Sequence, residues 1–179
     1  IYPRKSIPAN AILRYKYGMA VEEQSAGQRN KEPYNRFISM NFMICRDAFL
    51  KVRFDETFHL GYEDTLFGMQ LEQAGVEILH IDNPVYHLVE ENSEQFLMKI
   101  RRAVRNLDGH IEQMHSHVKL LRWYACVKRL GMAPLVAFLF RQIEKRLVSN
   151  LTSRKPSLKL FAFYKLGYLC NFLSQKKPD

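Results

Sequence analysis

Two neighbouring acids and a histidine are the residues of this chain best suited to chemistry. Glu63 and Asp64 open a predicted helix, and His87 follows a predicted strand further along the chain. A carboxylate within hydrogen-bond reach of an alcohol can accept its proton during attack on an electrophilic carbon. Imidazole and carboxylate groups together suit a divalent cation such as Mn²⁺. We therefore expect a carboxylate base and a metal-binding imidazole on one rim of an α/β sheet.

Each of these residues also has a purely structural interpretation. Acids are common in the first turn of a helix, because the unpaired backbone N–H groups there favour negative charge. A lone histidine at the end of a strand is more often structural than a metal ligand. The same helix terminus would, however, keep Asp64 ionised and ready to accept a proton.

The flanking sequence forms an ordered series that favours the chemical interpretation. It reads RFDE at 53–56, GYED at 61–64, QLEQAG at 70–75 and NPVYH at 83–87. This order resembles the second half of the catalytic domain in family 2 glycosyltransferases of the GT-A fold. Those enzymes show a GFDE turn, a GED acid pair opening a helix, an R-x-x-x-A-G helix end and a strand closing in V-x-H. The glycine of the turn and the arginine of the helix end are missing here, whereas the acid pair and the histidine are intact.

The resemblance implies a specific reaction and specific roles. It makes Asp64 the base of an inverting, metal-dependent transfer of sugar from a nucleotide-sugar donor to a glycan or lipid-linked acceptor. Glu63 would assist the base, and His87 would ligate the metal. The substrate-binding residues that it implies are Gly61, Tyr62 and Asn41. The expected setting is polysaccharide or cell-envelope glycan synthesis, at the cytoplasmic face of the membrane, with the protein attached peripherally.

One part of the family pattern is absent from the chain. The resembling enzymes complete their metal site with an Asp-x-Asp motif, and no Asp-x-Asp occurs in these 179 residues. We therefore expect Mn²⁺ or Mg²⁺ as cofactor, completed by a motif outside this chain. The expected fold is α/β: a partial GT-A sheet half, the acceptor-side half, over 1–92, followed by a helical, basic extension over 93–179. Lacking the nucleotide-binding half, such a fragment would be inactive alone.

Composition and periodicity fit one domain with a core. The apolar share is 47%, which argues against wholesale disorder. Nearly continuous apolar runs at 37–45 and 76–81 predict buried strands. Helices are expected at 63–74 and 134–150. The three cysteines are far apart, which favours a reducing compartment.

A heptad stripe follows the acid pair and the histidine in the sequence. Apolar residues step by three and four through Leu97, Ile100, Val104, Leu107, Ile111, Met114, Val118 and Leu121. The pair Asp108-Gly109 lies inside the stripe and is expected to divide it. One interpretation is a helix packed along the domain's own surface. The other is the seam of a homodimer over 97–121.

Positive charge is concentrated near the C-terminus. Residues 1–118 hold 14 Lys and Arg against 16 Asp and Glu, a net charge of −2, whereas residues 119–179 hold 13 against two, a net charge of +11. Basic helices with apolar faces fit an anionic membrane surface, and a solvated face is the alternative. Nucleic acid is least favoured, because no recognised binding motif occurs. No uncharged apolar run approaches the roughly 18 residues of a spanning helix.

Two other classes of function stand beside the enzyme. The first is a non-catalytic scaffold that uses its helices to join a membrane or a partner. The second is a nucleic-acid binder, whose affinity would fall steeply with salt.

Overall fold

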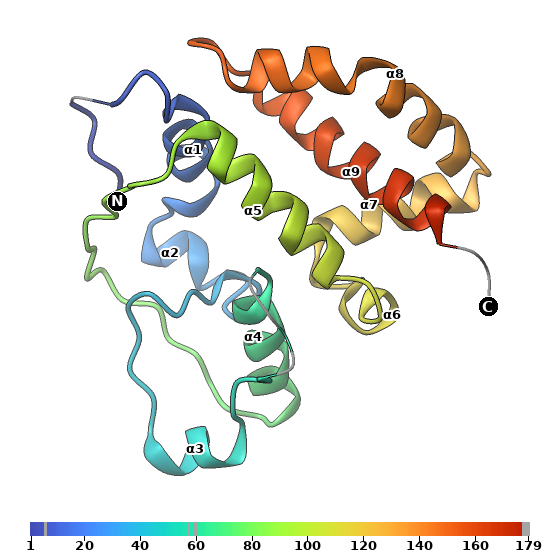
Figure 1. Ribbon diagram of the computed structural model, residues 1–179. Helices are drawn as coiled ribbons and strands as arrows, with labels where there is room; N and C mark the ends of the chain where they lie inside the picture. Colours follow the sequence, from blue (N-terminus) through green and yellow to red (C-terminus); the bar gives the residue numbers. More distant parts are fainter. Residues whose placement is uncertain (6, 57, 59–60, 177–179) are drawn as a thin grey trace.

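The protein is all-α in the computed structural model, which describes residues 1–5, 7–56, 58 and 61–176 (Figure 1). The N-terminal part contains α1 (Ile12–Tyr17), the π-helical turn η1 (Gly18–Glu22), α2 (Ala26–Arg29), the 3₁₀ turn η2 (Tyr34–Arg36), α3 (Arg46–Lys51) and α4 (Glu63–Gln73). The C-terminal part contains α5 (Ser93–Asn106), α6 (Ile111–Met114), α7 (Lys119–Arg129), α8 (Ala133–Leu151) and α9 (Leu158–Gln175).

The longest helices, α8 and α9, pack against each other as an antiparallel pair, and α5 runs alongside α9 in Figure 1. Pro134 lies in the first turn of α8, where its missing N–H costs no hydrogen bond. Gly167 of α9 faces Phe140 of α8 so closely that an added Cβ would lie 2.7 Å from the ring. The absence of a side chain at Gly167 therefore sets how closely α8 and α9 approach each other.

α5 joins this helix pair to the N-terminal part. A capping box starts the helix: the Asn92 side chain accepts from the Gln95 N–H, and the Gln95 side chain accepts from the Asn92 N–H. Farther along, Arg101 and Arg105 donate to the phenol oxygens of Tyr164 and Tyr168 on α9, at 2.5 and 2.6 Å. These bonds fix the rotation of α5 against α9.

The heptad stripe packs inside the chain. Six of its members are buried in the main core: Leu97, Val104, Leu107, Met114, Val118 and Leu121. The expected division is confirmed, because α5 ends at Asn106 and Gly109 adopts φ +85°. This burial agrees with the interpretation of the stripe as packed along the domain's own surface. The homodimer stays a prediction.

The predicted α/β fold is wrong. The described residues contain no strand and no sheet, so the partial GT-A sheet half is not formed, and an all-α architecture takes its place. The runs at 37–45 and 76–81, predicted as strands, contain no regular secondary structure. A strand needs a neighbour for its backbone hydrogen bonds, and these runs have no ladder partner among the described residues. An apolar run alone does not supply that neighbour.

The two helix predictions are confirmed, because a helix forms its backbone hydrogen bonds within its own segment. The helix expected at 63–74 spans Glu63–Gln73, and the one expected at 134–150 spans Ala133–Leu151. α4 buries Leu66 and Met69 in the main core and turns Phe67 and Leu71 towards a second, smaller core. It therefore holds the 37–54 region against the rest of the molecule.

We predict that Gly167→Ala destabilises the protein by about 1–3 kcal/mol, because the new methyl group overpacks the α8–α9 contact at Phe140. Urea denaturation would report this as a lower midpoint with an unchanged slope. Gly27→Ala in α2 is the matched control, since nothing lies within 4 Å of the added Cβ. That variant should keep or slightly raise the midpoint. Equal midpoints for Gly167→Ala and the wild type would contradict the packing described for α8 and α9.

Candidate functional site

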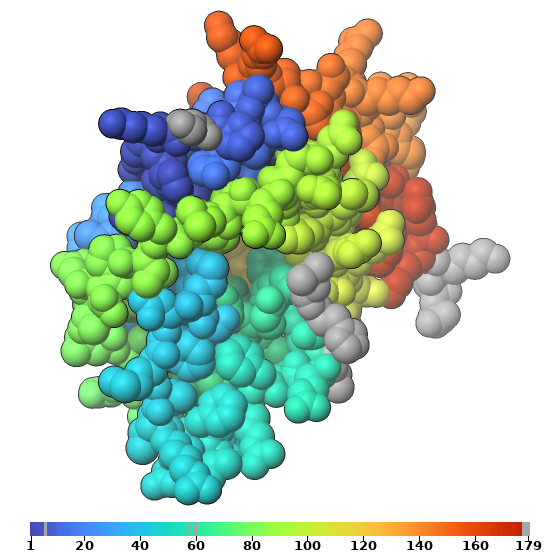
Figure 2. Space-filling view, turned by 60° about the vertical axis from the view of Figure 1, so that its left-hand side comes forward, coloured from blue at the N-terminus to red at the C-terminus, as the bar shows by residue number. Residues whose placement is uncertain are grey.

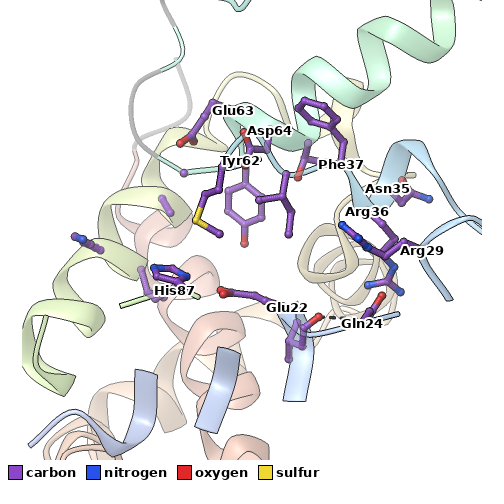
Figure 3. Close-up of a pocket in the computed structure, with 18 of the residues that line it drawn as sticks. Glu22, Gln24, Arg29, Asn35, Arg36, Phe37, Tyr62, Glu63, Asp64 and His87 are labelled. Carbon is purple, nitrogen blue, oxygen red and sulfur yellow. Dashed lines mark hydrogen bonds between the residues drawn. The ribbon is translucent and has the colours of Figure 1, made fainter. Parts of the chain in front are cut away.

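A cavity of about 440 Å³ opens between α5, the start of α4 and the segment after η2 (Figures 2 and 3). In Figure 2 it is the hollow bordered by α5 above and by the residues around 36–45 below. Most of its wall surface is apolar, with contributions from Phe37, Ile38 and Met40, although many of the lining residues are polar or charged. The other lining residues are Arg14, Val21, Glu22, Gln24, Arg29, Asn35, Arg36, Gly61, Tyr62, Glu63, Asp64, Thr65, His87, Lys99, Ile100 and Ala103.

A strained turn presents the acid pair to this cavity. Gly61 and Tyr62 both have positive φ, +94° and +72°. Gly61 lies so close to α5 that an added Cβ would come within 2.3 Å of the Ala103 Cβ. Tyr62 adopts the left-handed conformation without being glycine, which costs on the order of 1–2 kcal/mol. The packing of the turn on α5 holds α4 with its first residues at the cavity wall.

Asp64 lies in this wall in an environment that opposes its charge. Burial raises the pKa of the Asp64 carboxyl above its ordinary value, and hydrogen bonding to Ser39 offsets part of that rise. The Oδ1 atom of Asp64 and the Oε2 atom of Glu63 are buried and have no hydrogen-bond partner among the described residues. These two oxygens are shielded from solvent, so proton transfer from a ligand would use the part of the Asp64 side chain that lines the cavity.

His87 lines the same cavity from the opposite side, near Glu22 (Figure 3). Its Nδ1 atom lies 2.9 Å from the hydroxyl of Tyr2, and Tyr2 also donates to Glu22. Burial and then the nearby Arg14 guanidinium lower the pKa of the imidazole. These surroundings favour the neutral imidazole, which can accept a hydrogen bond.

Arg14 ties this wall together. It is 6% exposed, and it donates to both Glu22 oxygens at 3.1 Å and to Glu91 at 3.1 Å. Lys99 of α5 pairs with the other oxygen of Glu91 at 2.6 Å. Two carboxylates and two cations thus balance each other beside His87, as a buried guanidinium requires.

Two further arginines extend the positive charge of the cavity. Arg29 donates to the Ile81 carbonyl at 3.3 Å, and its buried Nε has no partner within the described part of the chain. Arg36 pairs at 3.3 Å with Glu32, four residues earlier in the chain. Planar guanidinium groups are suited to bind phosphate or carboxylate oxygens through paired N–H donors.

The predicted site residues are thus largely brought together. Gly61, Tyr62, Glu63, Asp64 and His87 all line the cavity. Asn41 does not: it is exposed and donates to the Asn83 carbonyl at 3.0 Å. The roles assigned to these residues remain predictions.

The described residues do not by themselves fit a metal. No group of three or more His, Cys, Asp and Glu side chains in the described ranges could hold one. His87 can offer at most one ligand, and its Nδ1 is already engaged by Tyr2. The Mn²⁺ or Mg²⁺ cofactor therefore stays a prediction from the sequence, and no step below passes through it.

The residues that surround the acid pair and the histidine could not be predicted from any local sequence pattern. Tyr2 and Glu22 meet His87 from 85 and 65 positions away in the chain, and such contacts have no local pattern. Arg14 carried a weak signal, since it lies between Leu13 and Tyr15 in a short apolar helix. A charged residue on a buried face indicates a buried partner of opposite charge.

Comparison with known proteins identifies no counterpart: no family model, no curated protein and no solved structure matches the chain. The resemblance to family 2 glycosyltransferases of the GT-A fold is corrected accordingly, because the described chain is helical and lacks the sheet on which that fold is built. What remains of the resemblance is the short motif series, whose acid pair and histidine share a cavity.

We predict that Asp64→Asn raises the melting temperature at pH 7 by about 2–4 °C, which corresponds to about 1 kcal/mol for a chain of this size. The pKa of Asp64 is higher in the folded protein than its ordinary value. Ionisation of Asp64 therefore lowers the free energy of unfolding as the pH rises from the ordinary carboxyl pKa to the pKa in the folded protein. Scanning calorimetry at pH 7 and pH 3 would measure the effect, which should vanish at pH 3.

Asp47→Asn is the matched control for this experiment. Asp47 is exposed in the first turn of α3, where its charge favours the helix terminus. Its removal should leave the melting temperature at pH 7 unchanged or slightly lower. If Asp64→Asn behaved in the same way, the Asp64 carboxyl would be an ordinary helix-capping acid.

Proposed function

We propose that this protein supplies the acceptor-binding side of a glycosyl-transfer site, in which the carboxylate of Asp64 is the general base. The observation that supports it best is the position of Asp64: its partly buried side chain lines a cavity that arginine and lysine side chains also line. The proposed substrates are a nucleotide sugar and a glycan or lipid-linked acceptor, in polysaccharide or cell-envelope glycan synthesis.

The proposed step moves one proton and exchanges one bond. An acceptor hydroxyl attacks the anomeric carbon of the donor sugar and loses its proton to Asp64. The bond from that carbon to the nucleotide diphosphate breaks on the opposite face, so the configuration inverts. The leaving diphosphate carries the electron pair away as negative charge. Lining guanidinium groups, such as those of Arg29 and Arg36, are of the type that binds such oxygens.

Burial of Asp64 fits the role of a base. A general base works best when its pKa lies near the working pH, because it is then ionised yet basic enough to take a proton. Burial raises the pKa of Asp64 from its ordinary value towards neutral pH. Glu63 lies beside it in the cavity lining and, in the proposal, binds a second hydroxyl of the acceptor sugar.

A second surface borders the cavity and fits the predicted absence of a nucleotide-binding part. Met40 lines the cavity, and the extended runs next to it expose large apolar side chains: Phe42, Met43, Leu79, Ile81, Val85, Tyr86 and Leu88. Apolar surface on this scale marks a contact with another element. In the proposal, the part that holds the nucleotide docks here, so that donor and acceptor meet over Asp64.

We predict that Asp64→Asn lowers kcat for sugar transfer by about 10²- to 10⁴-fold, the range typical of a lost general base. KM should change little, because the amide keeps the size of the side chain. The assay uses the protein expressed from its complete gene with UDP-glucose, UDP-galactose, UDP-N-acetylglucosamine and GDP-mannose, and follows release of the nucleoside diphosphate in the presence of glycan and lipid-linked acceptors.

Asp47→Asn is again the control and should retain full transfer, since Asp47 lies outside the cavity. Transfer by Asp64→Asn within a few-fold of the wild-type rate would reject the base assignment. Absence of transfer with every donor and acceptor, from a folded wild-type protein, would favour the alternative function. That alternative is a non-catalytic helical scaffold, and the exposed apolar surfaces of the chain support it.

A further inference from the structure

The corner between α7 and α8 exposes an unusual amount of apolar surface. The two helices meet at Gly131, which adopts φ +69°, and they are bent by 115° relative to each other. The corner carries six exposed large apolar side chains: Trp123, Leu130, Met132, Leu135, Phe138 and Leu139. Leu130 is 62% exposed and Trp123 is 57% exposed. We refer to these six residues as the apolar corner.

Basic side chains surround the apolar corner. On α7 these are Arg122, Lys128 and Arg129, and on α8 they are Arg141, Lys145 and Arg146, all of them exposed. None of the six forms an ion pair within the described part of the chain. The one acid of α8, Glu144, is already paired with Arg101 at 2.6 Å. The positive charge around the corner is therefore uncompensated.

The exposed face of α8 changes character along the helix. Its first turns present Leu135, Phe138 and Leu139, and the turns behind them present Arg141, Lys145 and Arg146. At 1.5 Å per residue, the first cation lies about 9 Å along the axis from Leu135. An interfacial element buries its apolar face about 5–10 Å into the boundary between lipid headgroups and acyl chains, so this spacing places the cations at the headgroups.

We propose that the apolar corner inserts into the interface of an anionic lipid bilayer, with the flanking lysines and arginines on the lipid phosphates. The pattern along α8 favours this partner: a nucleic-acid surface interleaves aromatic and basic side chains, whereas on α8 the exposed apolar residues come first and the basic residues follow. A protein partner of the same shape would need matching acids. Trp123 suits the headgroup level, where indole rings gather.

Docking at the corner does not depend on the cavity. In Figure 1 the α7–α8 junction lies at the right-hand edge, whereas α2 and α3 lie on the left. None of the six apolar residues lines the cavity. No single helix of the described residues is long and apolar enough to span a membrane; α7 and α8 together satisfy the length and composition, but as a bent pair. The inference therefore concerns attachment to one face of a bilayer.

Trp123 makes the proposal directly testable, because it is the one tryptophan of the chain. The protein is mixed with vesicles of pure phosphatidylcholine or of phosphatidylcholine with 30% phosphatidylglycerol. With the anionic vesicles we expect a blue shift of tryptophan emission, quenching by brominated acyl chains, and cosedimentation that weakens as salt is raised. Pure phosphatidylcholine should produce little of each.

Two variants separate the contributions of the apolar corner and of the surrounding basic residues. Leu135→Glu with Phe138→Glu should weaken binding to anionic vesicles at least tenfold, because the apolar contact is lost. Lys145→Gln with Arg146→Gln should weaken it about 30-fold at low salt. Leu50→Glu is the matched control, since Leu50 is 48% exposed on α3, away from the corner. It should bind like the wild type, and circular dichroism should show equal helix content for all variants.

Several results would overturn the proposal. One is unchanged Trp123 emission on adding anionic vesicles to folded protein, and another is wild-type binding by the variant with glutamates at 135 and 138. Equal binding to neutral and anionic vesicles would refute the role of the surrounding basic residues. A blue shift that appears in lipid-free buffer as protein concentration rises would assign the corner to a second copy of the chain instead.

Discussion

The buried guanidinium of Arg14 is the constraint on which the cavity depends. A charge so deeply removed from water is tolerable only when its partners are in place, and breaking such a pair costs about 3–5 kcal/mol. The partners here are Glu22, at the end of η1, and Glu91, just before α5. Because the Arg14 guanidinium needs both partners, the segments that carry Arg14, Glu22 and Glu91 are held together at one point. Through Glu22 the same network reaches Tyr2 and His87, so the wall opposite Asp64 is ordered by the same ion pairs.

α5 connects the segments held by Arg14 to the rest of the molecule. One side of the helix is fixed to α9 by the bonds from Arg101 and Arg105 to two tyrosines. Another side receives the Gly61 turn against Ala103, which sets the start of α4. The acid pair and the histidine are thus positioned from a common support, although they lie on separate segments. The α7–α8 corner extends from the opposite end of the helical part, which leaves it free for a separate contact.

Local features of the structure could be predicted from the sequence, whereas contacts between distant segments could not. The extents of α4 and α8 follow from apolar periodicity, and the break at Gly109 follows from helix propensity. The strands expected at 37–45 and 76–81 did not form, because a strand exists only with a neighbour that the run itself cannot specify. Asp64 and His87 were placed in one site from a short motif series, whereas the contact of Tyr2 with His87 joins distant positions and has no local signature.

The role of Asp64 as general base can be tested by the pH dependence of kcat/KM, measured beside a site-resolved carboxyl titration by ¹³C NMR. If Asp64 is the base, the rate profile has an acidic limb whose pKa coincides with that of the Asp64 carboxyl, both above the ordinary aspartate value. A rate profile without that limb, or an Asp64 that titrates at or below the ordinary value, would contradict this role.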